Sequence, residues 1–234
     1  MGYDIVPAEL VVKAMQDSGY KNAAYAIAEL IDNSIQANAT LVELLCLEKE
    51  EHVSQRTRSR LLKLAVLDNG SGMTEMELRR ALQFGNGGHL TDRKGIGRFG
   101  MGLPNSSMSQ GGRVDVWTWQ ESPSGAIYSY LDLDEISTGA MKEVPEPRPK
   151  AIPGEWMKVG KGIASSGTLV VWSRPDRCTW RTATAIVRNS EELVGRIYRR
   201  FIQDGQVVIR LASFNAVDLK APIIDRSALP NDPM

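Results

Sequence analysis

The chain has 234 residues, enough for one large domain or for one domain with a small appendage. Hydrophobic residues make up 42% and charged residues 24%, the balance of an ordinary soluble globular protein. The 28 basic residues equal the 28 acidic ones, so the bulk charge gives no support for direct DNA binding through phosphate contacts. No apolar run approaches the roughly 20 residues that span a bilayer, and the amino terminus lacks the features of a signal peptide. We therefore expect a cytoplasmic protein with no membrane contact.

The cysteines and histidines are too few and too scattered to predict a metal centre. Cys46, Cys178, His52 and His89 are isolated in the sequence, with no C-x-x-C pair. A zinc site needs three or four ligands at suitable spacing. We interpret the two cysteines as ordinary thiols.

The first third of the chain is predicted to contain two helices and then two strands. The helices are expected at 7–18 and 21–38, where apolar residues recur with helical spacing. Strands are expected at 41–47 and 61–67, and the charged stretch 48–59 between them is predicted to be a loop. Thr74 and Glu77 then form a capping box that starts a helix running to about residue 84.

The middle of the chain is rich in glycine, and the remainder is rich in strands. Residues 85–102 are dominated by glycine and charge and predict a loop, followed by a helix from Gly102 to Gln110. The proline-rich stretch between residues 133 and 167 is interpreted as a surface excursion. The other expected elements are strands at 113–120, 126–133, 167–173, 206–212 and 216–220, and an amphipathic helix at 183–203 with Ile186, Leu193, Ile197, Tyr198 and Phe201 as its apolar members. Strands and helices do not alternate, so we predict an α+β fold with a mixed, mostly antiparallel sheet and helices on one face.

A first candidate motif lies on the second predicted helix and reads Glu29-Leu30-Ile31-Asp32-Asn33-Ser34. Glu29 and Asn33 are four residues apart, so their side chains share one helix face. A carboxylate can act as general base on a water molecule, and an amide oxygen can ligate Mg²⁺. An ordinary exposed polar pair explains the same spacing.

A second motif, Asp68-Asn69-Gly70-Ser71-Gly72-Met73, follows the second predicted strand. Asp68 could accept a hydrogen bond from an exocyclic amine such as that of adenine. The two glycines would let the backbone pass close to a flat ring. The same letters are also a common turn signal.

A third motif runs from Gly95 to Gly102 as G-I-G-R-F-G-M-G and precedes a predicted helix. Backbone N–H groups at a helix amino terminus bind anions such as phosphates. Dinucleotide-binding folds use a similar glycine pattern, but there it follows a strand. Residues 85–94 do not read as a strand, so the dinucleotide interpretation is rejected.

The order and separation of these motifs resemble those of the GHKL (Bergerat-fold) ATPases, the group of gyrase, histidine kinases, MutL and an ATP-dependent heat-shock chaperone. The resemblance covers about residues 8–175 and is nearest to MORC-type ATPases and their prokaryotic relatives. Residues 28–40 are similar to the family's N-box, 68–73 to its D-x-G-x-G box, 95–102 to its glycine box and 166–171 to its last motif, with 85–100 as the ATP lid.

The resemblance implies a two-layer Bergerat fold that binds ATP and Mg²⁺ and hydrolyses ATP. It makes Glu29 the general base and Asn33 the Mg²⁺ ligand, and it assigns adenine recognition to Asp68 with help from Thr168. Asp32, which is adjacent to this pair, would either contact these two residues without touching the nucleotide or act as a capping residue at the surface. The full set of nucleotide-binding residues that it implies is Asn33, Asp68, Gly70, Gly72, Met73, Gly95, Gly97, Arg98, Phe99, Gly100, Met101, Gly102 and Thr168.

Two departures from the family pattern affect the predicted activity. Gln36 stands where MutL-like sequences carry an aspartate. Many relatives also use a lysine from a following transducer domain, and little of that domain fits in 206–234. We therefore predict an ATPase domain over 1–205, then terminal strands or the start of a truncated transducer domain, and expect hydrolysis by this chain to be slow.

The predicted function is Mg²⁺-dependent ATP binding and slow hydrolysis that drive lid closure and homodimerisation. The alternative is an ATP-gated dimerisation or scaffold module with little or no hydrolysis. A histidine kinase would need a phosphoacceptor histidine in an upstream helix, and neither His52 nor His89 is so placed. DNA or protein partners would be bound through further domains.

Overall fold

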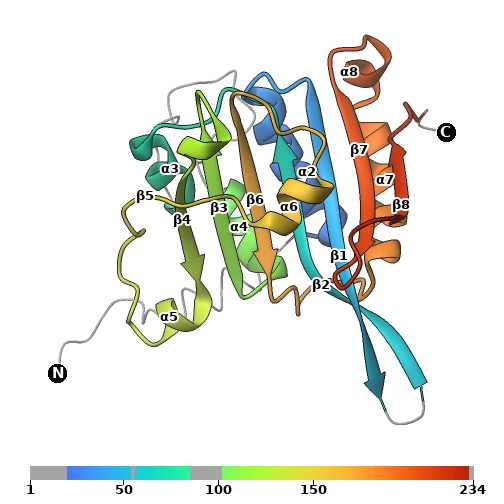
Figure 1. Ribbon diagram of the computed structural model, residues 1–234, viewed down its shortest axis with the longest axis horizontal. Coiled ribbons are helices and arrows are strands. Elements are labelled where there is room, and N and C mark those ends of the chain that lie inside the picture. Colours follow the sequence, from blue (N-terminus) through green and yellow to red (C-terminus); the bar gives the residue numbers. More distant parts are fainter. Residues whose placement is uncertain (1–19, 54–55, 85–101, 232–234) are drawn as a thin grey trace.

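The computed structural model describes residues 20–53, 56–84 and 102–231, and one eight-stranded sheet is its framework (Figure 1). The strand order is β5-β4-β3-β6-β2-β1-β7-β8. Neighbouring strands are antiparallel except for β1 and β7, which are parallel. The predicted mixed, mostly antiparallel sheet is confirmed. The strands are β1 Leu41–Val53, β2 Arg56–Asp68, β3 Arg113–Trp119, β4 Ile127–Asp132, β5 Arg148–Pro149, β6 Gly167–Ser173, β7 Val208–Asn215 and β8 Pro222–Ser227.

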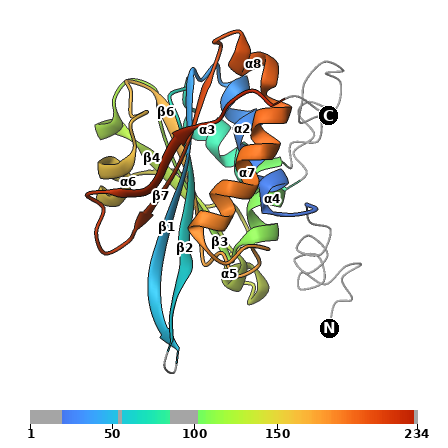
Figure 2. The same ribbon diagram turned by 90° about the vertical axis from the view of Figure 1, so that its right-hand side faces the viewer.

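The longer helices lie on one face of this sheet, as predicted (Figure 2). They are α2 Ala23–Gln36, α3 Glu75–Leu82, α4 Gly102–Gln110 and α7 Ala183–Ile197. The start of α2 is fixed by Asn22, whose side chain accepts the backbone N–H groups of Ala24 and Tyr25. The capping box of Thr74 and Glu77 begins α3, as the sequence indicates.

Both faces of the sheet are buried, because alternate side chains of one strand point to opposite faces. Leu44 and Val66 belong to the core beneath the helices, whereas Leu45 and Leu67 belong to a second core on the other face. The short helix α6, Gly154–Val159, covers this second core and buries Trp156 completely. The predicted surface excursion therefore holds for the exposed and half-buried residues 142–151, but not for the segment around α6, where Ile152, Trp156 and Val159 belong to the core.

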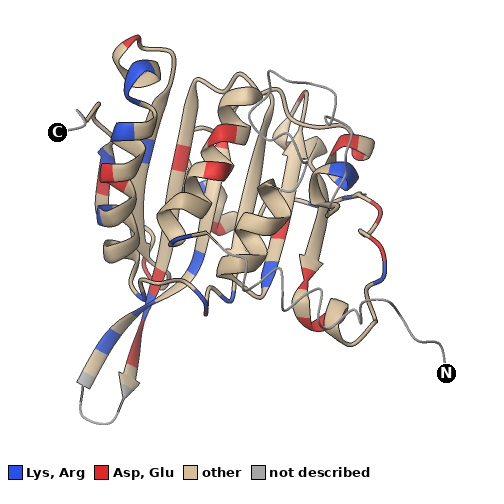
Figure 3. Ribbon diagram, turned by 180° about the vertical axis from the view of Figure 1, so that it is seen from behind, with Lys and Arg blue, Asp and Glu red and all other residues tan. Residues whose placement is uncertain are grey.

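The stretch 48–59, predicted to be a loop, instead prolongs β1 and β2 into a projecting hairpin arm (Figure 3). The two strands remain paired along the arm after a register shift between Leu47 and Glu48, and Arg60 forms an ion pair with Glu51 at 3.4 Å. The prediction failed because a polar, charged sequence can still form an exposed two-stranded ribbon when cross-strand pairs support it.

The carboxy-terminal elements also differ from the sequence prediction. The expected helix 183–203 breaks at Tyr198 into α7 and α8, Arg199–Gln203. Its expected apolar face is not continuous, since Ile197 and Phe201 are 44% and 37% exposed. Residues 216–220 form a turn in which Asp218 accepts the backbone N–H of Lys220, so the last strand lies further on, at β8.

Strands β7 and β8 belong to the same sheet as β2 and β6, which carry Asp68 and Thr168. Arg210 on β7 pairs with the buried Glu43 on β1 and with Asp225 on β8. The two remaining short helices are α5, Leu133–Ser137, and the 3-10 turn at Pro123–Gly125. The predicted helix at 7–18 and all but the last residue of the predicted 85–102 loop lie outside the described residues. Among the described helices, none is long and apolar enough to cross a membrane.

Candidate functional site

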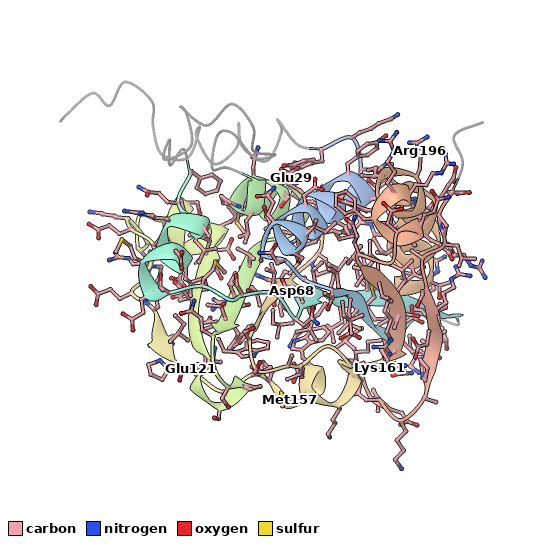
Figure 4. The ribbon with its side chains drawn as sticks, turned by 90° about the horizontal axis from the view of Figure 1, so that it is seen from above. Glu29, Asp68, Glu121, Met157, Lys161 and Arg196 are labelled. Atoms are coloured by element: carbon pink, nitrogen blue, oxygen red, sulfur yellow. The ribbon has the colours of Figure 1, made fainter. Side chains whose placement is uncertain are left out.

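Asp68 ends strand β2 beneath α2 and is a buried carboxylate with both oxygens engaged. It is 5% exposed, and Figure 4 shows it within the molecule, below the helical layer. Its Oδ2 accepts the Ser34 hydroxyl of α2 at 2.9 Å, and its Oδ1 accepts the Gly70 N–H at 2.9 Å. Burial raises the pKa of Asp68, and the bonds from Gly70, Ser34 and Thr168 counteract this rise. The carboxylate is therefore fixed in direction and able to accept a further donor.

Ser34 was not assigned a role from the sequence, although it follows directly on Asn33 in the first motif. Its side chain is buried against β2 and orients Asp68. The signal available in the sequence was a serine on the buried side of an amphipathic helix, where a hydroxyl needs a partner.

The glycines after Asp68 are required by close backbone contacts. A Cβ on Gly70 would lie 2.8 Å from the Ala37 Cβ. Gly72 has a φ of +68°, and a Cβ there would lie 2.1 Å from the carbonyl oxygen of Trp119. The loop is also tied to the end of α2 by a bond from the Ser71 N–H to the Ala37 carbonyl at 2.9 Å. The turn is thus built into the packing between α2 and the sheet.

Replacing Gly72 with alanine is expected to destabilise the fold by more than replacing Gly139, which serves as its control. Gly139 has a similar φ of +72°, but a Cβ on it would meet nothing within 4 Å. Gly139→Ala therefore reports the conformational cost alone, about 1 kcal/mol. Gly72→Ala adds the clash with Trp119, and we expect a total of at least ~3 kcal/mol. Thermal unfolding of both variants measures the difference, and equal losses would contradict the contact.

Thr168 is brought beside Asp68 by strand register, because β6 pairs the two residues directly. Its hydroxyl lies 3.2 Å from that of Thr118 on β3. The Thr118 hydroxyl also accepts the Met73 N–H at 2.8 Å and donates to the Gly167 carbonyl at 3.1 Å. Thr118 therefore joins the second motif to the last one, a role that its position in the sequence of β3 did not reveal.

Glu29 lies on α2 at the other end of the site, against the start of α4 (Figure 4). A Cβ on Gly102 would lie 2.9 Å from Glu29 Oε1, so the carboxylate contacts the first residue of α4. Burial raises the pKa of Glu29, and the neighbouring Asp32 raises it further. The pKa of Tyr20 is raised to about 12, mainly by burial and also by the negative charges of Glu29 and Asp32.

Asn33 follows Glu29 by one helical turn and is half-buried on the same side of α2. The described residues hold no cluster of three or more His, Cys, Asp or Glu side chains placed to bind a metal. A single amide oxygen fits Mg²⁺, which takes few protein ligands and completes its shell with phosphates and waters. The donor chemistry at Asn33 is therefore compatible with Mg²⁺ carried by a nucleotide.

The structure thus places the predicted residues in two groups joined by α2. The first group surrounds the end of β2 and comprises Asp68, Gly70, Gly72, Met73 and Thr168. The second comprises Glu29, which lies against Gly102 at the start of α4, and Asn33, one turn further along α2. The remaining predicted residues, Gly95, Gly97, Arg98, Phe99, Gly100 and Met101, lie outside the described part of the chain.

Comparison with known proteins supports the family assignment. Residues 20–163, more than half of the chain, match a family described as histidine kinase-, DNA gyrase B- and HSP90-like ATPases. Mouse ATPase MORC2B is 34% identical over 104 residues, and human ATPase MORC2 is 30% identical over 104 residues. Each match spans 44% of this chain but only 10% of the relative.

A solved structure shares the fold. The crystal structure of the N-terminal domain of a DNA repair protein superposes with a TM-score of 0.57 at 16% sequence identity, covering 92% of this chain and 56% of that one. The chain belongs to the family of histidine kinase-, DNA gyrase B- and HSP90-like ATPases, and within it is similar to the MORC ATPases.

Proposed function

We propose that this chain binds ATP with Mg²⁺ between α2, α4 and the end of β2, and that it hydrolyses ATP slowly. The observation that carries the proposal is the pairing of two environments along one helix. One end of α2 orients the buried Asp68 through Ser34, and its middle presents Glu29 to the amino terminus of α4. A buried acceptor at one end of α2 and a helix amino terminus beside its middle can hold a nucleobase and a polyphosphate at a fixed separation.

The adenine would lie over the Asp68–Met73 loop. The Asp68 carboxylate is an acceptor held in place by Ser34 and Gly70, and it suits an exocyclic amine. Such a buried charged acceptor discriminates strongly, because a base lacking the amine leaves it without a partner. Thr168, adjacent to Asp68 across the sheet, offers a hydroxyl at the same edge of the base.

The phosphates would lie at the amino terminus of α4. The first N–H groups of a helix lack partners within the helix, and the helix dipole favours an anion there. Glu29, at the same point, would accept a proton from the attacking water, since its raised pKa makes it a stronger base than an ordinary glutamate. Mg²⁺ held by Asn33 would neutralise charge that develops on the phosphates.

The test is phosphate release by the chain with Mg·ATP, measured beside calorimetric titration of the same nucleotide. The proposal expects saturable binding and slow turnover, and expects both to weaken when EDTA removes Mg²⁺. Binding without turnover would favour the alternative, an ATP-gated dimerisation module. A folded chain that binds no nucleotide would refute both.

We further propose that ATP binding closes the segment 85–100 over the nucleotide and drives homodimerisation through a contact that includes residues 1–20. A ligand shifts such an equilibrium only through its higher affinity for the closed state. Light scattering with a non-hydrolysable ATP analogue should therefore show the mass of a dimer. A monomer mass at saturating analogue would contradict this step. Any DNA or protein partner would be bound by further domains, and those domains would also determine what work the ATPase cycle performs.

A further inference from the structure

Tyr198 stands at the break between α7 and α8 and reaches back to the helix that carries Glu29. Its side chain is 2% exposed, and its backbone N–H and carbonyl join the two helices through Val194 and Ile202. The hydroxyl lies 2.7 Å from the carbonyl oxygen of Ala28 and 2.8 Å from Oδ1 of Asp32. A residue 170 positions further along the chain thus contacts the middle of α2.

The two acceptors that share the single hydrogen of this hydroxyl belong to one turn of α2. In an α-helix the carbonyl of residue 28 faces the N–H of residue 32, so Ala28 and Asp32 stack along the axis. Glu29 lies between these two residues, on the same turn. The Tyr198 hydroxyl therefore braces the backbone and one side chain of the turn from which the proposed general base projects.

The position of Glu29 leaves little room for this turn to move. On its far side, a Cβ on Gly102 would lie only 2.9 Å from Glu29 Oε1 and 3.2 Å from its Cγ. Rotation or sliding of α2 would drive the carboxylate into α4 or withdraw it from the helix amino terminus. Proton transfer tolerates such displacements poorly, because a shift of about 1 Å can cost on the order of 100-fold in rate.

A buried tyrosine hydroxyl needs a partner whatever its role, and one carbonyl would satisfy it. Tyr128 provides the comparison within this chain: it is equally buried, and its hydroxyl donates to Asp115 at 2.6 Å in a network on β3 and β4. That network links the neighbouring strands β3 and β4. Tyr198 differs because both of its acceptors flank the proposed catalytic glutamate.

We infer that Tyr198 is a positioning residue for ATP hydrolysis, holding the Ala28–Asp32 turn of α2 so that Glu29 meets the start of α4. This inference rests on the proposed ATPase activity. It also ties the catalytic helix to the α7–α8 junction, which leads directly into β7. A change at that junction would thereby alter the rate of hydrolysis and leave adenine recognition at Asp68 in place.

The experiment compares Tyr198→Phe with Tyr128→Phe, each of which removes one buried hydroxyl. Turnover of every variant is measured at the same pH, and the Kd is measured with a non-hydrolysable ATP analogue. Tyr198→Phe is expected to lower kcat about tenfold while the Kd stays within about twofold, the pattern of a contact that acts on the chemical step. Tyr128→Phe is expected to match the wild type in both.

Substitutions at Asp32 test the same hydrogen bond from its other end. Asp32→Asn keeps an oxygen that can accept the Tyr198 hydroxyl, so most of kcat should remain. Asp32→Ala removes this acceptor but leaves the Ala28 carbonyl, so it should lower kcat more than Asp32→Asn does and less than Tyr198→Phe does. Equal losses in the two Asp32 variants, or a Tyr198→Phe kcat equal to that of the wild type, would overturn the inference.

The failure of the proposed function gives a different result. If the wild type shows no turnover that Glu29→Gln lowers, the ATPase proposal itself fails. If the wild type turns over, Glu29→Gln is inactive and Tyr198→Phe is unimpaired, only the positioning role fails. A parallel loss of kcat and nucleotide affinity in Tyr198→Phe would assign Tyr198 to general packing of the fold and also overturn the inference.

Discussion

Asp68→Asn is expected to raise the Kd for ATP by at least ~100-fold, which corresponds to about 3 kcal/mol of binding free energy. The carboxylate already faces two donors, the Ser34 hydroxyl and the Gly70 N–H. An asparagine can keep one of these acceptor positions, but its amide nitrogen then turns a donor toward another donor. The adenine amine loses its charged acceptor, and a buried donor is left without a partner. Calorimetric titration of Mg·ATP measures the loss.

The matched control for this variant is Asp115→Asn. Asp115 is also buried, and it accepts hydrogen bonds from Arg113 and Tyr128 on the same sheet. Its replacement tests whether the loss of any buried carboxylate disturbs nucleotide binding. We expect the Kd of Asp115→Asn for ATP to equal that of the wild type. Comparable weakening in both variants, or unchanged binding by Asp68→Asn, would remove Asp68 from the adenine site.

Glu29→Gln is expected to lower kcat by at least ~100-fold while ATP binding is retained. General-base catalysis contributes about 100- to 10,000-fold, and a glutamine amide cannot take a proton from water. The substitution keeps the size and shape of the side chain, so the contact with Gly102 is preserved. Phosphate release under saturating Mg·ATP measures kcat, and Glu192→Gln on the exposed surface of α7 is the control. Unchanged turnover would exclude Glu29 as the base.

The pH dependence of kcat follows from the same carboxylate. Burial and the charge of Asp32 raise the pKa of Glu29 above the 4.5 of an ordinary glutamate. The base must be ionised to act, so activity is present above this raised pKa and is lost as the pH falls through it. The acid limb of the profile should therefore lie at higher pH than for an ordinary glutamate. A residual rate in Glu29→Gln should not show this limb.

The sequence contained more information on the site than on the limits of the elements. Glycines and capping residues act locally, so the turn after Asp68, the start of α3 and the helix from Gly102 to Gln110 could be predicted from neighbouring residues. Burial was less predictable. The polar residues of the β1–β2 arm predicted a loop, and the proline-rich stretch gave no sign that α6 is buried, because pairing and packing with distant residues overrode local tendencies.

By itself, the sequence determined which chemical groups this protein can bring to a nucleotide. The i, i+4 spacing of Glu29 and Asn33 on a helix and the glycines that follow Asp68 fix local geometry through the helical period and the local backbone conformation. The tertiary structure decided which groups support them. Ser34 reaches Asp68, Thr118 joins Met73 to Thr168, and Tyr198 braces the turn of Glu29. These contacts depend on strand register and helix packing between residues far apart in the chain, so the local sequence does not identify the partner of each residue.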